Sequence, residues 1–281
     1  MPWTPSLLAA AFALTAAVSW GSGDFTAGVA TRRVGPFHTV LISYAFGLVT
    51  LTLAALARFE SLPPLPDLLW GALGGLSGVI GLGFLLRGFA AGRMGIVAPV
   101  SAMLATIIPV VFAAVTEGLP RGTQLVGFGF ALVSIWMLSR PDRLGGRPAG
   151  LGAGLLAGLG FAGFFIALDQ VGEGAIFWPL VAGRLTICVL MVAIALVSHR
   201  PLLPQVPPLG LLALAGILDV GGNLFFLLAT QAGRLDVAAV LVSLYPAVTA
   251  ILARIIAKEH LARLQAIGVA VAVLAIVLIS T

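Results

Sequence analysis

Charged side chains are scarce in this sequence of 281 residues, where Asp, Glu, Lys and Arg make up 9% and hydrophobic residues 60%. Soluble domains carry roughly a quarter charged residues, so the composition excludes a water-soluble fold. The few charges stand in short breaks between long apolar runs. Because a helix needs about 20 apolar residues to cross the hydrocarbon core, the sequence predicts an all-α integral membrane protein that crosses the bilayer many times.

Cysteine and histidine are also rare. Cys188 is the one cysteine, which excludes an internal disulfide and a CxxC site. His38, His199 and His260 are far apart and near span ends, which favours interfacial polar residues over metal ligands. The GxGxxG string at residues 158–163 lies in an apolar run with no preceding strand, so it does not indicate a dinucleotide site. We expect no cofactor, no metal and no enzymatic activity.

The basic residues are dispersed although the net charge is +5. Lys and Arg occur singly over many turns and form no basic face, which argues against nucleic acid as a partner. The anionic cytoplasmic leaflet of a lipid bilayer is the partner that such dispersed charges favour. No Walker A loop, HExxH or GxSxG occurs either, which argues against an ATP-driven pump and the common hydrolases.

The apolar runs predict ten spanning helices. Each run is continuously apolar rather than alternating, which favours helices over barrel strands. The predicted spans are 6–30, 37–57, 67–90, 94–116, 122–138, 150–169, 175–198, 208–232, 236–257 and 264–280. Glycines at 71, 74, 78 and 81 share one face of the third span, and those at 154 and 158 share one face of the sixth, which predicts close helix packing there.

The two halves of the sequence repeat each other. A shift of 141 positions aligns residues 82–98 with 223–239, and the Ala-Gly-Arg triplet at 91–93 meets an identical triplet at 232–234. Each half then holds five spans, and an odd number forces the second copy to enter the membrane from the opposite side. The sequence therefore predicts two inverted five-helix repeats, residues 1–140 and 141–281.

The chain resembles the drug/metabolite transporter superfamily, and within it the ten-helix carriers of EamA type. The residues that carry the resemblance are Trp20-Gly21-Ser22-Gly23-Asp24-Phe25, the two Ala-Gly-Arg turns, Leu244-Tyr245-Pro246, Lys258-Glu259 and Gln265-Ala266-Ile267-Gly268. The resemblance implies export or uptake of amino acids, amines, nucleobases, sugars or related metabolites across a bacterial-type cell (inner) membrane.

Charged residues inside the spans are the strongest candidates for a transport site. A lone Asp or Arg at mid-membrane costs about 2.5 to 3.5 kcal/mol on insertion scales, so it needs a partner or water. Asp24, Arg184, Asp219 and the neighbouring Asn223 are predicted to face a central cavity, where they bind solute or a proton. The alternative is that Arg184 and Asp219 form a buried pair that only ties two spans together.

Aromatic side chains complete the candidate site. Trp20, Tyr44 and Tyr245 lie within spans and could stack on a flat or apolar solute. Anchoring at the membrane interface is the alternative for each. Arg87 and Arg254 lie close enough to span ends to snorkel and are left out of the site.

The sequence favours a secondary carrier that works by alternating access, as a monomer or homodimer. Its coupling ion would be a proton, bound through Asp24 or Asp219. One alternative is a membrane-embedded enzyme acting on a lipid or isoprenoid, which would gather Asp, His or Arg at one membrane face. A passive channel would need a continuous polar stripe. The side on which the termini lie stays open, because the count of basic residues puts them outside and the resemblance puts them in the cytoplasm.

Overall fold

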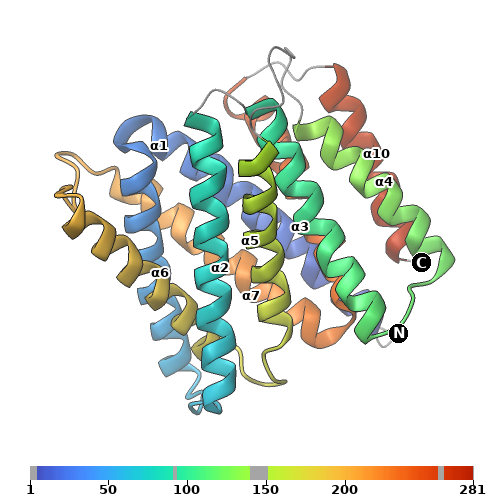
Figure 1. The fold of residues 1–281 in the computed structure, drawn as a ribbon, viewed down its shortest axis with the longest axis horizontal. Coiled ribbons are helices and arrows are strands. Elements are labelled where there is room, and N and C mark those ends of the chain that lie inside the picture. Colours follow the sequence, from blue (N-terminus) through green and yellow to red (C-terminus); the bar gives the residue numbers. More distant parts are fainter. Residues whose placement is uncertain (1–4, 91–93, 140–150, 259–262, 281) are drawn as a thin grey trace.

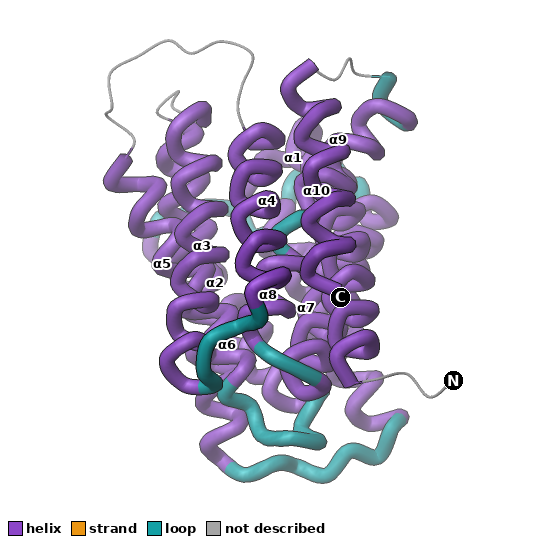
Figure 2. The backbone as a smooth tube through the Cα atoms, turned by 90° about the vertical axis from the view of Figure 1, so that its right-hand side faces the viewer, coloured by secondary structure: helices purple, strands orange, loops and turns teal. Residues whose placement is uncertain are grey.

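The computed structural model describes residues 5–90, 94–139, 151–258 and 263–280, and these residues form helices and connecting loops without strands (Figures 1 and 2). The helices are α1 (Pro5–Ala57), α2 (Leu65–Ala90), α3 (Met94–Thr116), α4 (Gly122–Ser139), α5 (Leu151–Asp169), α6 (Phe177–Val197), α7 (Leu209–Ala232), α8 (Leu235–Val242), α9 (Tyr245–Ile255) and α10 (Arg263–Ser280). The predicted all-α class is confirmed. The predicted repeat boundary at 140/141, the Ala91-Gly92-Arg93 turn and Glu259 lie outside the described residues.

Helix α1 is two arms joined at a bend. Gly35 has φ 77° and ψ 163°, a conformation that side-chain-bearing residues avoid, and Pro36 follows it. A straight helix of 53 residues would be about 80 Å long, well over twice the hydrocarbon thickness. Figure 1 shows the two arms meeting at an angle. The N-terminal arm (5–34) and the C-terminal arm (36–57) correspond to the first two predicted spans.

The predicted ninth span, 236–257, corresponds to one apolar stretch, Leu235–Ile255, but this stretch is not one continuous helix. The chain between 236 and 257 forms α8 and α9, which are separated at Ser243 and Leu244. Pro246 lies in the first turn of α9, where its missing N–H breaks no helical hydrogen bond. After Leu244 the chain begins a new helix, α9, instead of continuing α8.

The count of spans differs from the ten separate helices predicted. Eight stretches of the described residues are long and apolar enough to cross a membrane when α1 counts as one and Leu235–Ile255 counts as one, and Gly122–Leu138 is a shorter apolar helix. The multi-pass membrane character is clear at either count.

The two halves pack in corresponding ways. Helix α7 lies against both arms of α1, α2 lies against α5 and α6, and α4 lies against α10. A shift of 141 residues relates α2 to α7 and the two arms of α1 to α5 and α6. The packing of α7 against the two arms of α1 therefore corresponds to the packing of α2 against α5 and α6.

The bundle has two ends, which are named here by the turns they hold. The α2–α3 face holds the ends of α2, α4 and α9, and the α3–α4 face holds the ends of α3, α5 and α7 (Figures 1 and 2). The Arg234 side chain, in the α7–α8 turn, donates hydrogen bonds to the carbonyls of Glu117 (3.3 Å) and Gly118 (2.7 Å) in the α3–α4 turn. Helix α7 therefore ends where α3 ends. Because α3 runs back along α2, α7 runs opposite to α2.

Glycines let the backbones of neighbouring helices touch, and Gly71, one of the glycines predicted to pack closely, is among them, since a Cβ there would stand 2.0 Å from the carbonyl oxygen of Pro179. A Cβ on Gly75 of α2 would stand 2.3 Å from the carbonyl oxygen of Gly183 in α6. In the other half, a Cβ on Gly216 of α7 would stand 2.1 Å from the carbonyl oxygen of Ser43 in α1. Both distances are far shorter than a van der Waals contact. These two glycines are equivalent under the 141-residue shift, so close packing is conserved between the halves.

Candidate functional site

A cavity of about 560 Å³ lies between the two halves. Its wall combines α1, α2, α3 and the end of α4 with α5, α6, α7, α9 and the start of α10. Pockets for small molecules commonly measure roughly 300–1,000 Å³. All seven side chains predicted from the sequence to form the site line it: Trp20, Asp24, Tyr44, Arg184, Asp219, Asn223 and Tyr245.

Arg184 and Asp219 form an ion pair in the cavity wall. The Nδ2 group of Asn223 donates to the Asp219 carboxylate (3.1 Å) and to its backbone carbonyl (2.8 Å), because the two residues are one turn apart on α7. The Arg184 guanidinium lies 4.3 Å from the ring centre of Tyr44, in a cation–π contact. Arg184 is only 5% exposed, whereas the Asp219 side chain is 27% exposed. The pair links α6 to α7 and also lines the cavity.

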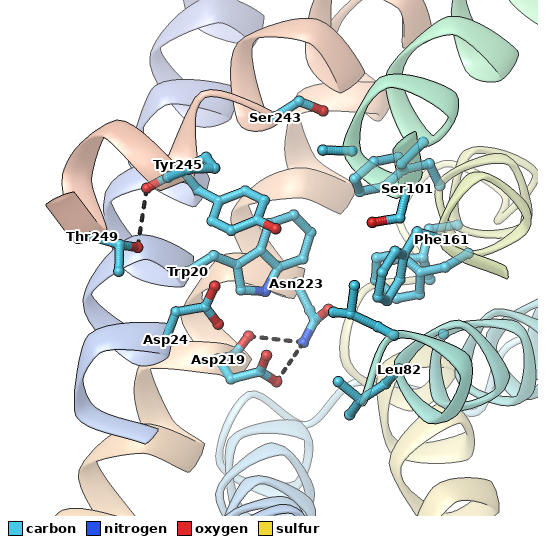
Figure 3. A pocket seen from close by; sticks show the side chains of 18 of the residues that line it. Trp20, Asp24, Leu82, Ser101, Phe161, Asp219, Asn223, Ser243, Tyr245 and Thr249 are labelled. Carbon is cyan, nitrogen blue, oxygen red and sulfur yellow. Dashed lines mark hydrogen bonds between the residues drawn. The ribbon is translucent and has the colours of Figure 1, made fainter. Parts of the chain in front are cut away.

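Asp24 is the unpaired charge of the cavity. It projects from α1 into the same space as Trp20 and Tyr245 (Figure 3) and is exposed there. Its carboxylate is within electrostatic reach of the Tyr245 hydroxyl. Among the described residues no side chain or backbone group gives Asp24 a hydrogen bond or an ion pair, unlike Asp219.

An aromatic cluster forms one side of the cavity. The ring of Trp20 has its centroid 5.9 Å from Phe164, 5.9 Å from Phe165 and 6.0 Å from Phe226. These rings come from α1, α5 and α7, so both halves contribute. Gly222 lies against the indole, and a Cβ there would be 2.2 Å from its ring. Trp20 is thus held in one orientation by packing.

Several lining residues were not anticipated from the sequence. Hydroxyl, amide and aromatic groups add to the wall: Ser101, Phe161, Phe164, Phe165, Ser243, Thr249 and Gln265. Thr249 shows why they gave no signal, because its hydroxyl bonds the backbone carbonyls of Gly21 (3.0 Å) and Tyr245 (3.3 Å) and costs nothing inside an apolar span. Only charges carry a burial penalty large enough to stand out in a sequence.

A second polar group, the Arg234 cluster, consists of Arg234, Asp236 and Glu117 on the α3–α4 face. Arg234 makes a two-pronged ion pair with Asp236 (2.7 Å at the shortest), whose side chain is fully buried. The Glu117 carboxylate accepts a hydrogen bond from the backbone N–H of Leu235 (3.3 Å). The hydrogen bonds to Asp236 raise the pKa of Arg234, and burial raises the pKa of Glu117. The cluster joins the α3–α4 turn to the α7–α8 turn.

Further contacts connect the loops of the α3–α4 face. Gln231 of α7 donates to the carbonyls of Gly172 (3.1 Å) and Ala175 (3.0 Å) in the α5–α6 loop. The carboxylate of Glu60, in the α1–α2 loop, accepts from the N–H of Ile176 (2.7 Å) at the start of α6. A carboxylate is favourable there because the first N–H groups of a helix have no partner within it. Connections from both halves are thus bonded together at this face.

An apolar helical bundle with a polar-lined cavity between two similar halves is typical of membrane transporters. The family model described as the EamA-like transporter family matches residues 7–140 and again residues 148–281. The chain therefore belongs to the EamA-like transporter family, as the resemblance in the sequence indicates, and is a multi-pass membrane transporter of the drug/metabolite type. Members of this family are transporters and not enzymes, so the alternative of a lipid or isoprenoid enzyme is not favoured.

The fold also matches a solved structure. A protein known by its crystal structure shares 20% sequence identity with this chain, with a TM-score of 0.78, and the match covers 96% of both chains. At that identity the likeness concerns the fold alone. The comparison with curated proteins gives no match.

Proposed function

We propose that the protein is a secondary carrier that moves a small organic metabolite across the cytoplasmic membrane by alternating access. The observation that carries this proposal is the cavity of about 560 Å³ between the halves, whose wall holds Asp24 from one half and Arg184 and Asp219 from the other. Rocking one half against the other around such a cavity would expose it to each side of the membrane in turn.

The proposal includes two inverted repeats, residues 1–140 and 141–281, and ten crossings. The bend at Gly35 makes α1 two crossings, while α8 and α9 together make one. The opposite directions of α2 and α7 and the corresponding packing of the halves support the inversion. An odd number of crossings in each repeat is what inversion requires.

The ends of the cavity differ, which supports alternating access. Its lining extends to Leu85, Leu138, Ala253 and Gln265 near the α2–α3 face, and to Leu168 and Leu180 near the α3–α4 face, so the difference between the ends lies in how the loops are bonded. At the α3–α4 face the Arg234 cluster and the Gln231 and Glu60 contacts bond the loops of the two halves together. We propose that this face is the closed side of the carrier in this conformation.

Removing the Arg234 side chain is expected to open that side. In a Cys188→Ser background, a cysteine at Leu180, a buried residue of the cavity wall, reports access from either side. With Arg234→Ala, a membrane-impermeant thiol reagent added on the α3–α4 side labels the new cysteine several-fold faster, because both Asp236 and the α3–α4 carbonyls lose their donor. Arg121→Ala, on the same face and exposed, leaves the labelling rate unchanged. Equal rates in the Arg234→Ala and Arg121→Ala proteins contradict the closed-side assignment.

Proton coupling is proposed to run through Asp24 rather than Asp219, because Asp219 is held by Arg184 and Asn223. Proteoliposomes screened with metabolites, with and without an imposed proton gradient, test the carrier and its coupling. The expected result is gradient-driven accumulation of at least one solute. Asp24→Asn abolishes the dependence of flux on external pH, whereas Glu173→Gln, which neutralises an exposed carboxyl outside the cavity, preserves it. If neither Asp24→Asn nor Asp219→Asn alters the pH dependence, protons are not the coupling ion.

A further inference from the structure

The charges that line the cavity do not balance. The described lining residues include two carboxylates, Asp24 and Asp219, and one guanidinium, Arg184. With all three ionised, the wall carries one negative charge in excess. Because a charge costs several kcal/mol in a medium of low polarity unless it is compensated, the excess charge determines which solutes the cavity stabilises.

Arg184 is poorly placed to bind an anionic group of a solute. Its guanidinium is already paired with Asp219, stacked on Tyr44 and nearly buried. A solute carboxylate would have to displace Asp219 and leave that side chain without its partner, which is a costly exchange for a buried pair. Anions therefore gain little binding free energy from Arg184. A zwitterion finds a counter-charge for its ammonium group but none for its carboxylate.

Asp24 is placed to bind a cationic group. Its carboxylate is exposed to the cavity, has no protein partner among the described residues, and lies with Trp20 and Tyr245 around the same space (Figure 3). Indole and phenol rings attract cations through their π faces. The rest of the wall is largely apolar, with the rings of Phe161 and Phe164 and small residues of α2. An ammonium group next to an apolar or aromatic body matches this arrangement.

Resting on the proposed function, we infer that the carrier's substrate class is a monovalent organic cation, an amine or ammonium with an apolar body, whose charge is held by Asp24. The Arg184–Asp219 pair excludes the second, anionic group of amino acids. Asp24 holds either a proton or the cation, so binding of one cation releases the proton from that carboxyl to water. Because the proton and the cation share the Asp24 carboxylate, the carrier exchanges one for the other.

Three probes that share a phenyl ring distinguish the effect of solute charge on binding from the effect of solute size. Phenyltrimethylammonium and tert-butylbenzene are isosteres that differ by one positive charge, and phenylalanine is a zwitterion with the same ring. Each competes with labelled phenyltrimethylammonium for the full-length protein in nanodiscs. In the wild type the ammonium binds more tightly than either rival, and Asp24→Asn weakens its binding about ten- to a hundredfold, because the coulombic attraction between the carboxylate and the cation is lost. Glu173→Gln, which neutralises an exposed carboxyl outside the cavity, leaves its binding unchanged.

A charge-neutralising variant sharpens the test. Asp219→Asn frees Arg184 while Asp24 remains, so the cavity then offers one group of each sign. The affinity for phenylalanine relative to the ammonium rises in this variant. An unchanged ratio in a protein that elutes as a folded species speaks against the role assigned to the pair.

The outcomes separate this inference from the proposed function. If the wild type binds tert-butylbenzene or phenylalanine as tightly as the ammonium, or if Asp24→Asn binds the ammonium as the wild type does, the cation assignment is overturned. Should proteoliposomes accumulate phenylalanine or a neutral metabolite in that case, the carrier still stands. If no solute of any charge is moved, the proposed function is overturned as well. The preference among probes in the wild type decides the inference even if a variant does not fold.

Discussion

Arg184→Met lowers the free energy of unfolding by about 3–5 kcal/mol, the cost of leaving one member of a buried ion pair without its partner. Asp219 then lies in the cavity wall with Asn223 as its side-chain donor among the residues that the structure describes. The double variant Arg184→Met/Asp219→Leu regains most of that stability, because neither charge remains, yet it does not recover transport. Unfolding in detergent followed by circular dichroism measures the first effect, and proteoliposome flux measures the second.

Leu185→Met is the control for this pair of variants. Leu185 is next in sequence, lies on α6 and is exposed on the outside of the bundle, so its change is expected to cost less than about 0.5 kcal/mol. A double variant as unstable as Arg184→Met would show that side-chain packing, and not the unpaired carboxylate, is the source of the loss. A double variant that transports normally would remove the pair from the mechanism.

Gly75→Ala is expected to destabilise the bundle by about 1–3 kcal/mol or more, as overpacking does. The added Cβ would stand 2.3 Å from the carbonyl oxygen of Gly183, a backbone atom that cannot rotate away. Helices α2 and α6 must then separate, and the cavity wall that both form is distorted. Gly216→Ala, the equivalent change in the other half, has a similar effect because the oxygen of Ser43 lies 2.1 Å away.

Gly83→Ala provides the comparison on the same helix. A Cβ at Gly83 meets nothing within 4 Å, and alanine is the better helix former by about 1 kcal/mol. The variant is therefore as stable as the wild type or more so. Thermal unfolding of the purified proteins gives the ranking, and equal stability of Gly75→Ala and Gly83→Ala would refute the close contact.

Hydropathy predicted most helix positions, because each crossing must be continuously apolar whatever its tertiary contacts. It could not predict that α1 continues through residues 31–34, since a polar stretch with Arg32 and Arg33 normally marks a loop. It also missed the break at Ser243, where the residues on both sides are apolar. Pro246 was the available signal, but a proline is equally compatible with a kink in a continuous span.

The site was predictable where burial is costly. Asp24, Arg184 and Asp219 stood out because charge is rare in apolar spans, and the structure places all three at one cavity. Which of them are partners could not be read from the sequence, since the pairing of Arg184 with Asp219 depends on how α6 and α7 are oriented. The Arg234 cluster was missed because Asp236 was taken as the first residue of a span, where an acidic side chain is unremarkable.

The short helix α9 is coupled to the N-terminal arm of α1. The Thr249 hydroxyl donates a hydrogen bond to the backbone carbonyl of Gly21. A Cβ on Gly21 would be only 2.6 Å from the backbone carbonyl oxygen of Tyr245. Asp24 lies three residues beyond Gly21, on nearly the same side of the arm. A tilt of α9 about the break at Ser243 would therefore also move the N-terminal arm of α1 and the Asp24 carboxylate. Asp24 and Ser243 line the same cavity, so a solute bound at Asp24 faces the junction between α8 and α9.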